Sequence, residues 1–283
     1  MRIILLTRND YQHCYVANKL AAAYTLSAIV VDRGKPKSML ARVRTLLRRY
    51  TLCQLLSRLV SKAISTLCRV KKHERIEMFR VLGRENCERH LHKDIIKYVN
   101  GLNTMAGFET IKALNPDVIF VFGTAVVSDK ILSLAHRVAI NMHTGISPYY
   151  RGAGCTFWPL YNEELHMLGA TIHECTSKID GGMIYEIGRV TLELNDNLST
   201  VFARCVKLGT ELYTKVIGEL LAGELHGTQQ QFELGHEYKA AMKGWWQERT
   251  VRRKIKKGLI KDYVTRQSST ESDEGSESGC LRT

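Results

Sequence analysis

The chain lacks several patterns that would assign it to a specific class of protein. Its eight cysteines are scattered and form no CxxC pair, so a zinc-binding or thioredoxin-type motif has no support. No apolar run reaches the length of a membrane-spanning helix. Residues Met1 to Leu6 are too few for the apolar region of a signal peptide and instead predict a strand. We therefore expect a protein with free thiols in a reducing cytoplasm.

Acidic residues are scarce in one part of the chain only. The net charge at pH 7 is +13. Residues 33–84 contain fifteen Lys or Arg and two Glu, an excess that equals the net charge of the whole chain. Charges in the remaining sequence cancel, so the basic character belongs to a single segment and says little about the rest of the protein.

Within this basic segment, apolar residues between Leu52 and Leu67 recur at helical spacing, while Arg58 and Lys62 lie on other faces. Two interpretations remain open. In the first, the apolar stripe packs on the body of the protein or on a second subunit, which makes a homodimer a candidate. In the second, residues 35–84 bind an acidic membrane surface or another polyanion, and the protein is peripheral at the membrane.

Elsewhere the chain alternates apolar strands with helices. Strands are expected at 2–7, 26–32, 117–122 and 138–143, and helices at 11–24, 104–114 and 129–135. This alternation predicts an α/β fold with a doubly wound, mostly parallel sheet, in which ligands bind beyond the C-terminal strand ends. Two later strands, at 169–175 and 182–194, are expected to be antiparallel, and a long helix is expected at 198–223.

The most informative motif runs from Asn141 to Gly152 and is followed by Asp180 in Ile-Asp-Gly-Gly. Asn141 and His143 are two residues apart on a predicted strand, so their side chains point the same way. If the fold brings Asp180 to His143, an amide, an imidazole and a carboxylate form the parts of an acyl-transfer site. Taken singly, the three residues have ordinary alternatives: a strand-end cap, a buried histidine and a turn former.

Together with the loop Ser147 to Gly152 and the strand Gly169-Ala-Thr-Ile-His173, these motifs resemble the formyltransferase family that uses 10-formyltetrahydrofolate. The resemblance is clear over about residues 105–222 and fainter over 1–32. It implies a Rossmann-like formyltransferase fold, 10-formyltetrahydrofolate as co-substrate with no metal, and a primary amine as acceptor.

The resemblance also implies roles for individual residues. The family's catalytic residues are matched by Asn141, His143 and Asp180. The segment whose backbone holds the pterin ring is matched by Phe122, Gly123, Thr124, Ala125 and Val126. The loop beside the formyl group and the acceptor is matched by Ser147, Pro148, Tyr150, Arg151 and Gly152. His173 is interpreted as a packing residue, and Cys155 is a weak candidate for a nucleophile because nothing nearby in the sequence should lower the pKa of its thiol.

The resemblance implies a formyltransferase domain over residues 1–225, with a basic helical insertion at 33–104. A helical C-terminal extension is expected at 226–266. Residues 267–283 are rich in Ser, Glu and Gly and are predicted to be a disordered tail.

Three classes of acceptor compete. Enzymes that formylate phosphoribosylglycinamide carry a glycine-rich phosphate loop after the first strand, whereas Thr7 to Tyr11 contain no glycine. Enzymes that formylate methionyl-tRNA add a C-terminal β-barrel, which the sequence after Gly227 does not resemble. A nucleotide-linked amino sugar is therefore the predicted acceptor, with charged tRNA as the alternative. A non-catalytic folate-fold protein, tethered to membrane or nucleic acid by its basic segment, is a third hypothesis.

Overall fold

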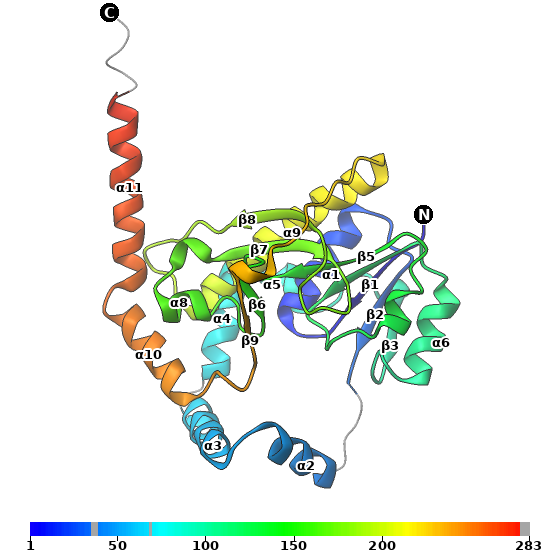
Figure 1. Cartoon of the computed structure of the whole chain (residues 1–283), viewed down its shortest axis with the longest axis horizontal. Coiled ribbons are helices and arrows are strands. Elements are labelled where there is room, and N and C mark those ends of the chain that lie inside the picture. Colours follow the sequence, from blue (N-terminus) through cyan, green and yellow to red (C-terminus); the bar gives the residue numbers. More distant parts are fainter. Residues whose placement is uncertain (35–38, 68–69, 278–283) are drawn as a thin grey trace, which may run out of the picture.

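The computed structural model describes residues 1–34, 39–67 and 70–277. Its centre is a seven-stranded sheet in the order β3-β2-β1-β4-β5-β7-β8 (Figure 1). The pairs among β1 to β5 are parallel, and β7 pairs antiparallel with both β5 and β8. The strands are β1 (Ile3–Thr7), β2 (Ala28–Asp32), β3 (Ile96–Val99), β4 (Val118–Phe122), β5 (Val138–His143), β7 (Gly169–Glu174) and β8 (Ile184–Arg189). The predicted α/β fold with a mostly parallel sheet is confirmed.

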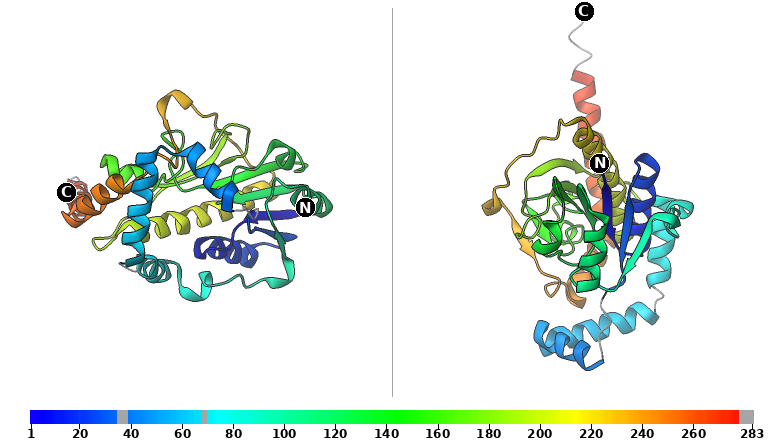
Figure 2. Two further views of the ribbon diagram at one scale, coloured as in Figure 1. Left: turned by 90° about the horizontal axis from the view of Figure 1, so that it is seen from below. Right: turned by 90° about the vertical axis from the view of Figure 1, so that its right-hand side faces the viewer.

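The central strands are apolar throughout because both faces of the sheet are covered. In β1, Ile3 and Leu5 pack into the core on one face, whereas Ile4 and Leu6 pack on the other. Helices pack on both faces (Figure 2). The first face is covered by α1 (Tyr11–Ala23), α4 (Val70–Leu82) and α9 (Leu198–Ala222), and the second by α6 (Met105–Leu114) and α7 (Asp129–Leu132).

Helix α9 is anchored to the sheet by a buried tyrosine. The hydroxyl of Tyr213 lies between β4 and β5, where it accepts the N–H of Val121 at 3.0 Å and donates to the carbonyl of Ile140 at 2.6 Å. Buried backbone groups need such partners because no water replaces them. Tyr213 therefore fixes the spacing of the two strands whose C-terminal ends begin the cavity described below.

A second core lies beside the end of the sheet. Here β6 (Tyr150–Gly152) pairs in parallel with β9 (His236–Tyr238). Buried side chains from α8 (Trp158–Asn162), α10 (Trp245–Lys256) and α11 (Leu259–Glu277) pack together, including Trp158, Val251 and Ile260. The C-terminal extension is therefore not only helical, because it also supplies β9. Single 3₁₀ turns occur at Lys93–Ile95 (η1), Leu165–Met167 (η2) and Phe232–Leu234 (η3).

Residues 33–104 differ from the predicted helical insertion. Only α2 (Met39–Arg49) and α3 (Leu52–Leu67) stand away from the sheet (Figure 2). Met78 and Leu82 of α4 are buried in the main core, as is Cys87 of α5 (Arg84–Cys87), and β3 is an edge strand of the sheet. The sequence did not predict this strand because it lies at the edge of the sheet. Lys97 and Tyr98 are exposed there, so no apolar run marks the strand.

The structure also differs from the disordered tail that the sequence predicts for residues 267–283. Helix α11 continues to Glu277, and residues 278–283 lie outside the described part of the chain. The hydroxyls of Ser268 and Ser269 donate to the carbonyls of Val264 and Arg266, so the serines bond within the helix. No proline interrupts the stretch. In the described residues, no helix combines the length and the apolar character needed to cross a bilayer.

Removing the Tyr213 hydroxyl should destabilise the protein measurably. In Tyr213→Phe, the buried N–H of Val121 and carbonyl of Ile140 lose a partner, which should lower the free energy of unfolding by about 1–3 kcal/mol. Urea denaturation would measure the change. Tyr24→Phe is the matched control, since its hydroxyl makes one bond, to the carbonyl of Thr214, in a part-buried position. An equal loss in both variants would contradict the anchoring role of Tyr213.

Candidate active site

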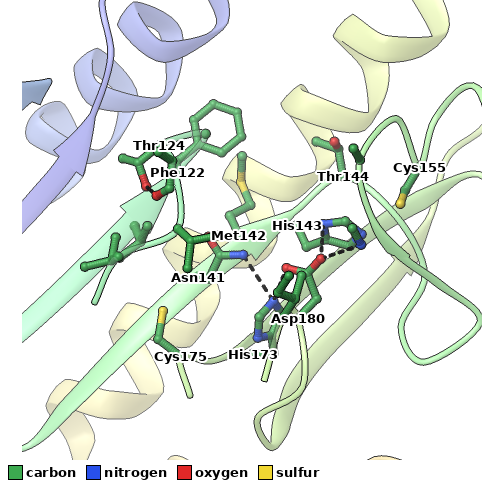
Figure 3. Close-up of a pocket in the computed structure, with 18 of the residues that line it drawn as sticks. Phe122, Thr124, Asn141, Met142, His143, Thr144, Cys155, His173, Cys175 and Asp180 are labelled. Atoms are coloured by element: carbon green, nitrogen blue, oxygen red, sulfur yellow. Dashed lines mark hydrogen bonds and ion pairs between the residues drawn. The ribbon is translucent and has the colours of Figure 1, made fainter. Parts of the chain in front are cut away.

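A cavity of about 730 Å³ opens at the C-terminal ends of β4 and β5. Its walls come from five segments of the chain, four of which include residues labelled in Figure 3. They are the end of β4 with residues 123–127, the end of β5 with Thr144, residues 152–156, the turn at 175–180 with His173, and the segment 237–240. This is where parallel α/β sheets bind ligands, as the sequence predicted.

Strand pairing places the polar side chains of the cavity. Asn141 and His143 alternate with the buried Met142 on β5 and point together. Because β7 runs antiparallel to β5, His173 lies directly opposite Asn141, and Thr171 lies opposite His143. Asp180 follows β7 in a left-handed conformation with φ of 48°. A Cβ on Gly182, two residues after Asp180, would overlap the carbonyl of Glu174. Only glycine therefore allows this turn to close against β7.

The carboxylate of Asp180 joins three segments at the cavity. One oxygen, Oδ2, lies 3.4 Å from Nδ1 of His143 and accepts the N–H of Gly152 at 2.7 Å. The other, Oδ1, lies 3.5 Å from Nε2 of His173. The backbone carbonyl of Asp180 accepts a hydrogen bond from the side chain of Gln230 at 2.9 Å. The structure therefore brings Asn141, His143 and Asp180 together.

Asp180 is held ionised by its surroundings. Burial alone would raise the pKa of this carboxyl, but the neighbouring rings of His143 and His173 and the N–H of Gly152 act against burial. The result is a pKa well below the usual range. At neutral pH the group is thus a fixed negative charge that orients the two imidazole rings, and it is a poor proton acceptor.

Both ring nitrogens of His143 face oxygen atoms. Nε2 lies 2.9 Å from the carbonyl oxygen of Tyr150, which can only accept, while Nδ1 faces Asp180. The ring is nearly buried, with 8% of its surface exposed. These two contacts hold the ring in one orientation between Tyr150 and the turn at Asp180.

His173 was interpreted from the sequence as a packing residue, and the structure places it in the site. Its Nδ1 lies 2.8 Å from the carbonyl of Glu174 and donates to it, so Nε2 is left to accept from the amide of Asn141 at 3.1 Å. This bond fixes the amide plane and leaves the second amide hydrogen for the cavity. The antiparallel register of the two strands, which sets His173 against Asn141, was the signal that could have revealed it.

All five residues of the expected pterin segment, Phe122 to Val126, line the cavity. Gly123 has φ of 64°, and a Cβ at this position would overlap the ring of His13. The hydroxyl of Thr7 donates to the carbonyl of Phe122 at 3.1 Å and accepts from Nδ1 of His13 at 3.2 Å. His13 and Thr7 thus support the backbone of this segment from beneath.

The expected acceptor loop is only partly in contact with the cavity. Gly152 lines it, whereas Ser147, Pro148, Tyr150 and Arg151 lie behind the wall. Tyr150 is buried, its ring stacks on Tyr238, and its hydroxyl bonds to Glu164. Ser147 is fully buried, and the guanidinium of Arg151 lies 4.9 Å from the ring centre of Phe232. A direct role for these four residues in acceptor binding stays a prediction.

Sequence reasoning also missed the contribution of the C-terminal extension. Residues Glu237 to Ala240 form one wall, and Lys239 brings a positive charge to it, as Lys178 does from the turn before Asp180. Cys155 lines the cavity too, but burial and the nearby Asp180 raise the pKa of its thiol well above the usual range. The thiol therefore stays protonated, which agrees with the expectation that nothing nearby lowers its pKa.

A match to a known family bears on what this site does. Residues 88–217 match the family described as formyl transferase. The chain contains a formyl transferase domain. The matched region includes β4, β5 and β7 and all three of Asn141, His143 and Asp180, and it places the chain among the one-carbon transferases that transfer formyl groups.

Solved formyltransferase structures share the fold. A sugar N-formyltransferase from a Shewanella species superposes with a TM-score of 0.53 at 13% identity, over 86% of this chain and 78% of that one. An N-formyltransferase from Helicobacter canadensis, in complex with folinic acid and dTDP-3-aminofucose, has a TM-score of 0.51 at 14% identity, over 85% of this chain and 71% of that one. A phosphoribosylglycinamide formyltransferase from Anaplasma phagocytophilum has a TM-score of 0.51 at 13% identity, over 84% of this chain and 99% of that one. At these identities, the likeness establishes the fold.

The buried His13 should make the stability of the protein depend on pH. Burial lowers the pKa of His13 from 6.5 to about 4, although Asp10 partly opposes this. Between these values the unfolded chain binds a proton that the folded chain does not, so stability falls as the pH falls. From pH 7.5 to pH 5, this one group should cost about 2 kcal/mol of unfolding free energy.

Urea denaturation at both pH values would measure this loss in the wild type and in His13→Gln. The difference in unfolding free energy between the two pH values should be about 2 kcal/mol smaller in the variant than in the wild type. His90 has a pKa that burial also lowers, so it keeps part of the pH dependence in both proteins. An identical difference in the two proteins would show that His13 is not held neutral.

Proposed function

We propose that this protein transfers a formyl group from 10-formyltetrahydrofolate to the amino group of a nucleotide-linked amino sugar. The observation that carries formyl transfer is the contact of Asp180 with His143, beside Asn141, at one cavity in a chain with a formyl transferase domain. The cavity volume of about 730 Å³ is in the range of a small-molecule ligand site.

The residues at the end of β4 fit a folate co-substrate. Phe122 to Val126 offer backbone groups along one wall, and the positive φ of Gly123 turns that backbone toward the cavity. These residues would hold the pterin ring, with the formyl group directed at Asn141 and His143. The Helicobacter canadensis structure, which contains folinic acid, supports the binding of a folate by a protein with this fold.

In the proposed reaction, the amine nitrogen forms a bond to the formyl carbon, and the bond from that carbon to N10 of the folate breaks. The formyl oxygen becomes negative in between, and the second amide hydrogen of Asn141 is available to donate to it. Loss of such a donor typically costs about 2.7–4 kcal/mol of barrier. His143 carries the proton that leaves the amine toward N10, and Asp180 keeps the imidazole in place.

Charge at the cavity supports an acceptor that carries phosphate. Lys178 and Lys239 both lie in its walls and are exposed, so they can pair with a diphosphate. By contrast, the N-terminus of α1 has Asp10 at its cap, and Thr7 to Tyr11 contain no glycine. A carboxylate at that position repels phosphate, which argues against the ribotide phosphate of phosphoribosylglycinamide binding there.

Charged initiator tRNA is the second candidate acceptor. The fifteen Lys and Arg of residues 33–84 could track a phosphate backbone. The amino sugar is preferred because the two lysines lie in the cavity itself, whereas the basic helices α2 and α3 stand apart from the sheet.

Substitution of each of the three central residues should abolish turnover without unfolding the protein. Asn141→Ala, His143→Ala and Asp180→Asn should each lower kcat by about 100-fold or more, because they remove, respectively, the donor to the formyl oxygen, the proton carrier and the charge that holds the imidazole. Steady-state kinetics with 10-formyltetrahydrofolate would measure this. His136→Ala is the control for His143→Ala, since this exposed histidine lies just before the opposite end of β5. Near-normal turnover in any of the three would refute the role of that residue.

The acceptor can be identified by mass spectrometry. The protein is incubated with 10-formyltetrahydrofolate and, in turn, a panel of nucleotide-linked amino sugars, glycinamide ribotide and methionyl-tRNA. A mass increase of one formyl group is expected on an amino sugar, and Lys178→Ala with Lys239→Ala should raise its KM. Product on tRNA or ribotide alone would overturn the proposed acceptor while leaving formyl transfer intact.

A further inference from the structure

Helices α2 and α3 expose an unusual amount of apolar surface. In α2, Leu40 is 84% exposed; in α3, Leu56 is 62% and Leu59 63% exposed. Further exposed apolar side chains on the two helices are Met39, Val43, Leu46, Leu47, Leu52 and Val60. Monomeric soluble proteins seldom leave a continuous apolar stripe of this kind uncovered.

The orientation of α3 is the reverse of what packing in a globular protein requires. Its polar residues face the protein: the side chain of Gln54 donates to the carbonyl of Ala241 at 3.3 Å, and the hydroxyl of Ser57 accepts the N–H of Trp245 at 2.8 Å. Leu56 and Leu59 lie about 150° around the helix from this polar face, at 100° per residue. The apolar stripe therefore points away from the body.

Positive charge accompanies the exposed stripes. Arg44 and Arg48 are exposed on α2, and Lys71, Lys72 and Arg75 are exposed at the start of α4, beside a single exposed acid, Glu74. Apolar side chains flanked by Arg and Lys are the pattern of helices that lie in the interface of a bilayer with acidic headgroups.

We propose that α2 and α3 bind the surface of an anionic lipid bilayer. The charge balance selects this occupant, because a second copy would bring the same excess of positive charge to the contact. A nucleic acid would pair with the arginines but would leave the leucines uncovered. A bilayer satisfies both features, since its headgroups attract the cations and its acyl region accepts the leucines.

The proposed surface adjoins the cavity. Ala241, whose carbonyl accepts a hydrogen bond from Gln54 of α3, directly follows the wall segment Glu237 to Ala240. A bilayer that holds α3 therefore lies near the wall that carries Lys239, and the cavity is held close to the membrane surface.

Flotation of the full chain with lipid vesicles tests this surface, and it requires no enzymatic activity. The vesicles are pure phosphatidylcholine or phosphatidylcholine with phosphatidylglycerol. Partitioning should be at least about tenfold stronger on the anionic vesicles. Arg44→Gln with Arg48→Gln should weaken it by about fivefold per arginine, and Leu56→Ser with Leu59→Ser by about tenfold or more.

Met105→Ser with Leu221→Ser is the matched control, because these apolar side chains are also exposed but lie outside α2 and α3. Circular dichroism should show equal melting for all variants. The proposal is overturned if wild type binds neither vesicle, binds both equally, or if the leucine variant binds as wild type does. It is also overturned if lipid-free protein forms dimers that the leucine variant abolishes, or if binding occurs to RNA but not to vesicles.

Discussion

The site depends on one buried carboxylate. Asp180 comes from a left-handed turn after β7 and contacts His143 on β5, His173 on β7 and the N–H of Gly152. A buried charge is costly unless it is paired and hydrogen-bonded, so these partners must converge for the chain to fold as it does. The same convergence orients the imidazole and, through His173, the amide of Asn141. Stability and chemistry thus share a single set of contacts.

Other buried polar groups keep the two strand ends in place around that carboxylate. Tyr213 bridges β4 and β5 from α9, and His13 with Thr7 supports the turn at Phe122 and Gly123. Each group satisfies backbone atoms that water does not reach. A cavity of this size can stay open at the strand ends because its floor is tied by directional bonds and not by apolar packing alone.

The C-terminal extension links the cavity to the basic helices. Its strand β9 pairs with β6 and supplies a wall of the cavity, and the next residues bond to the polar face of α3. The formyl transferase domain matches only residues 88–217, so this link lies outside the matched region. The two proposals therefore rest on different parts of the chain: formyl transfer on the matched region, and bilayer binding on segments outside it.

The sequence by itself determined the parallel sheet and the pairing of Asn141 with His143 on one strand face, because apolar runs and a two-residue period are local properties. Through a family resemblance it also indicated that Phe122 to Val126, at the end of β4, belong to the site, and these residues line the cavity. Only the tertiary structure decided that Asp180 reaches His143, that His173 belongs to the site and that Lys239 forms part of its wall. It also decided that α3 turns its leucines outward. These facts depend on strand register and on contacts between segments far apart in the chain, which no local pattern encodes.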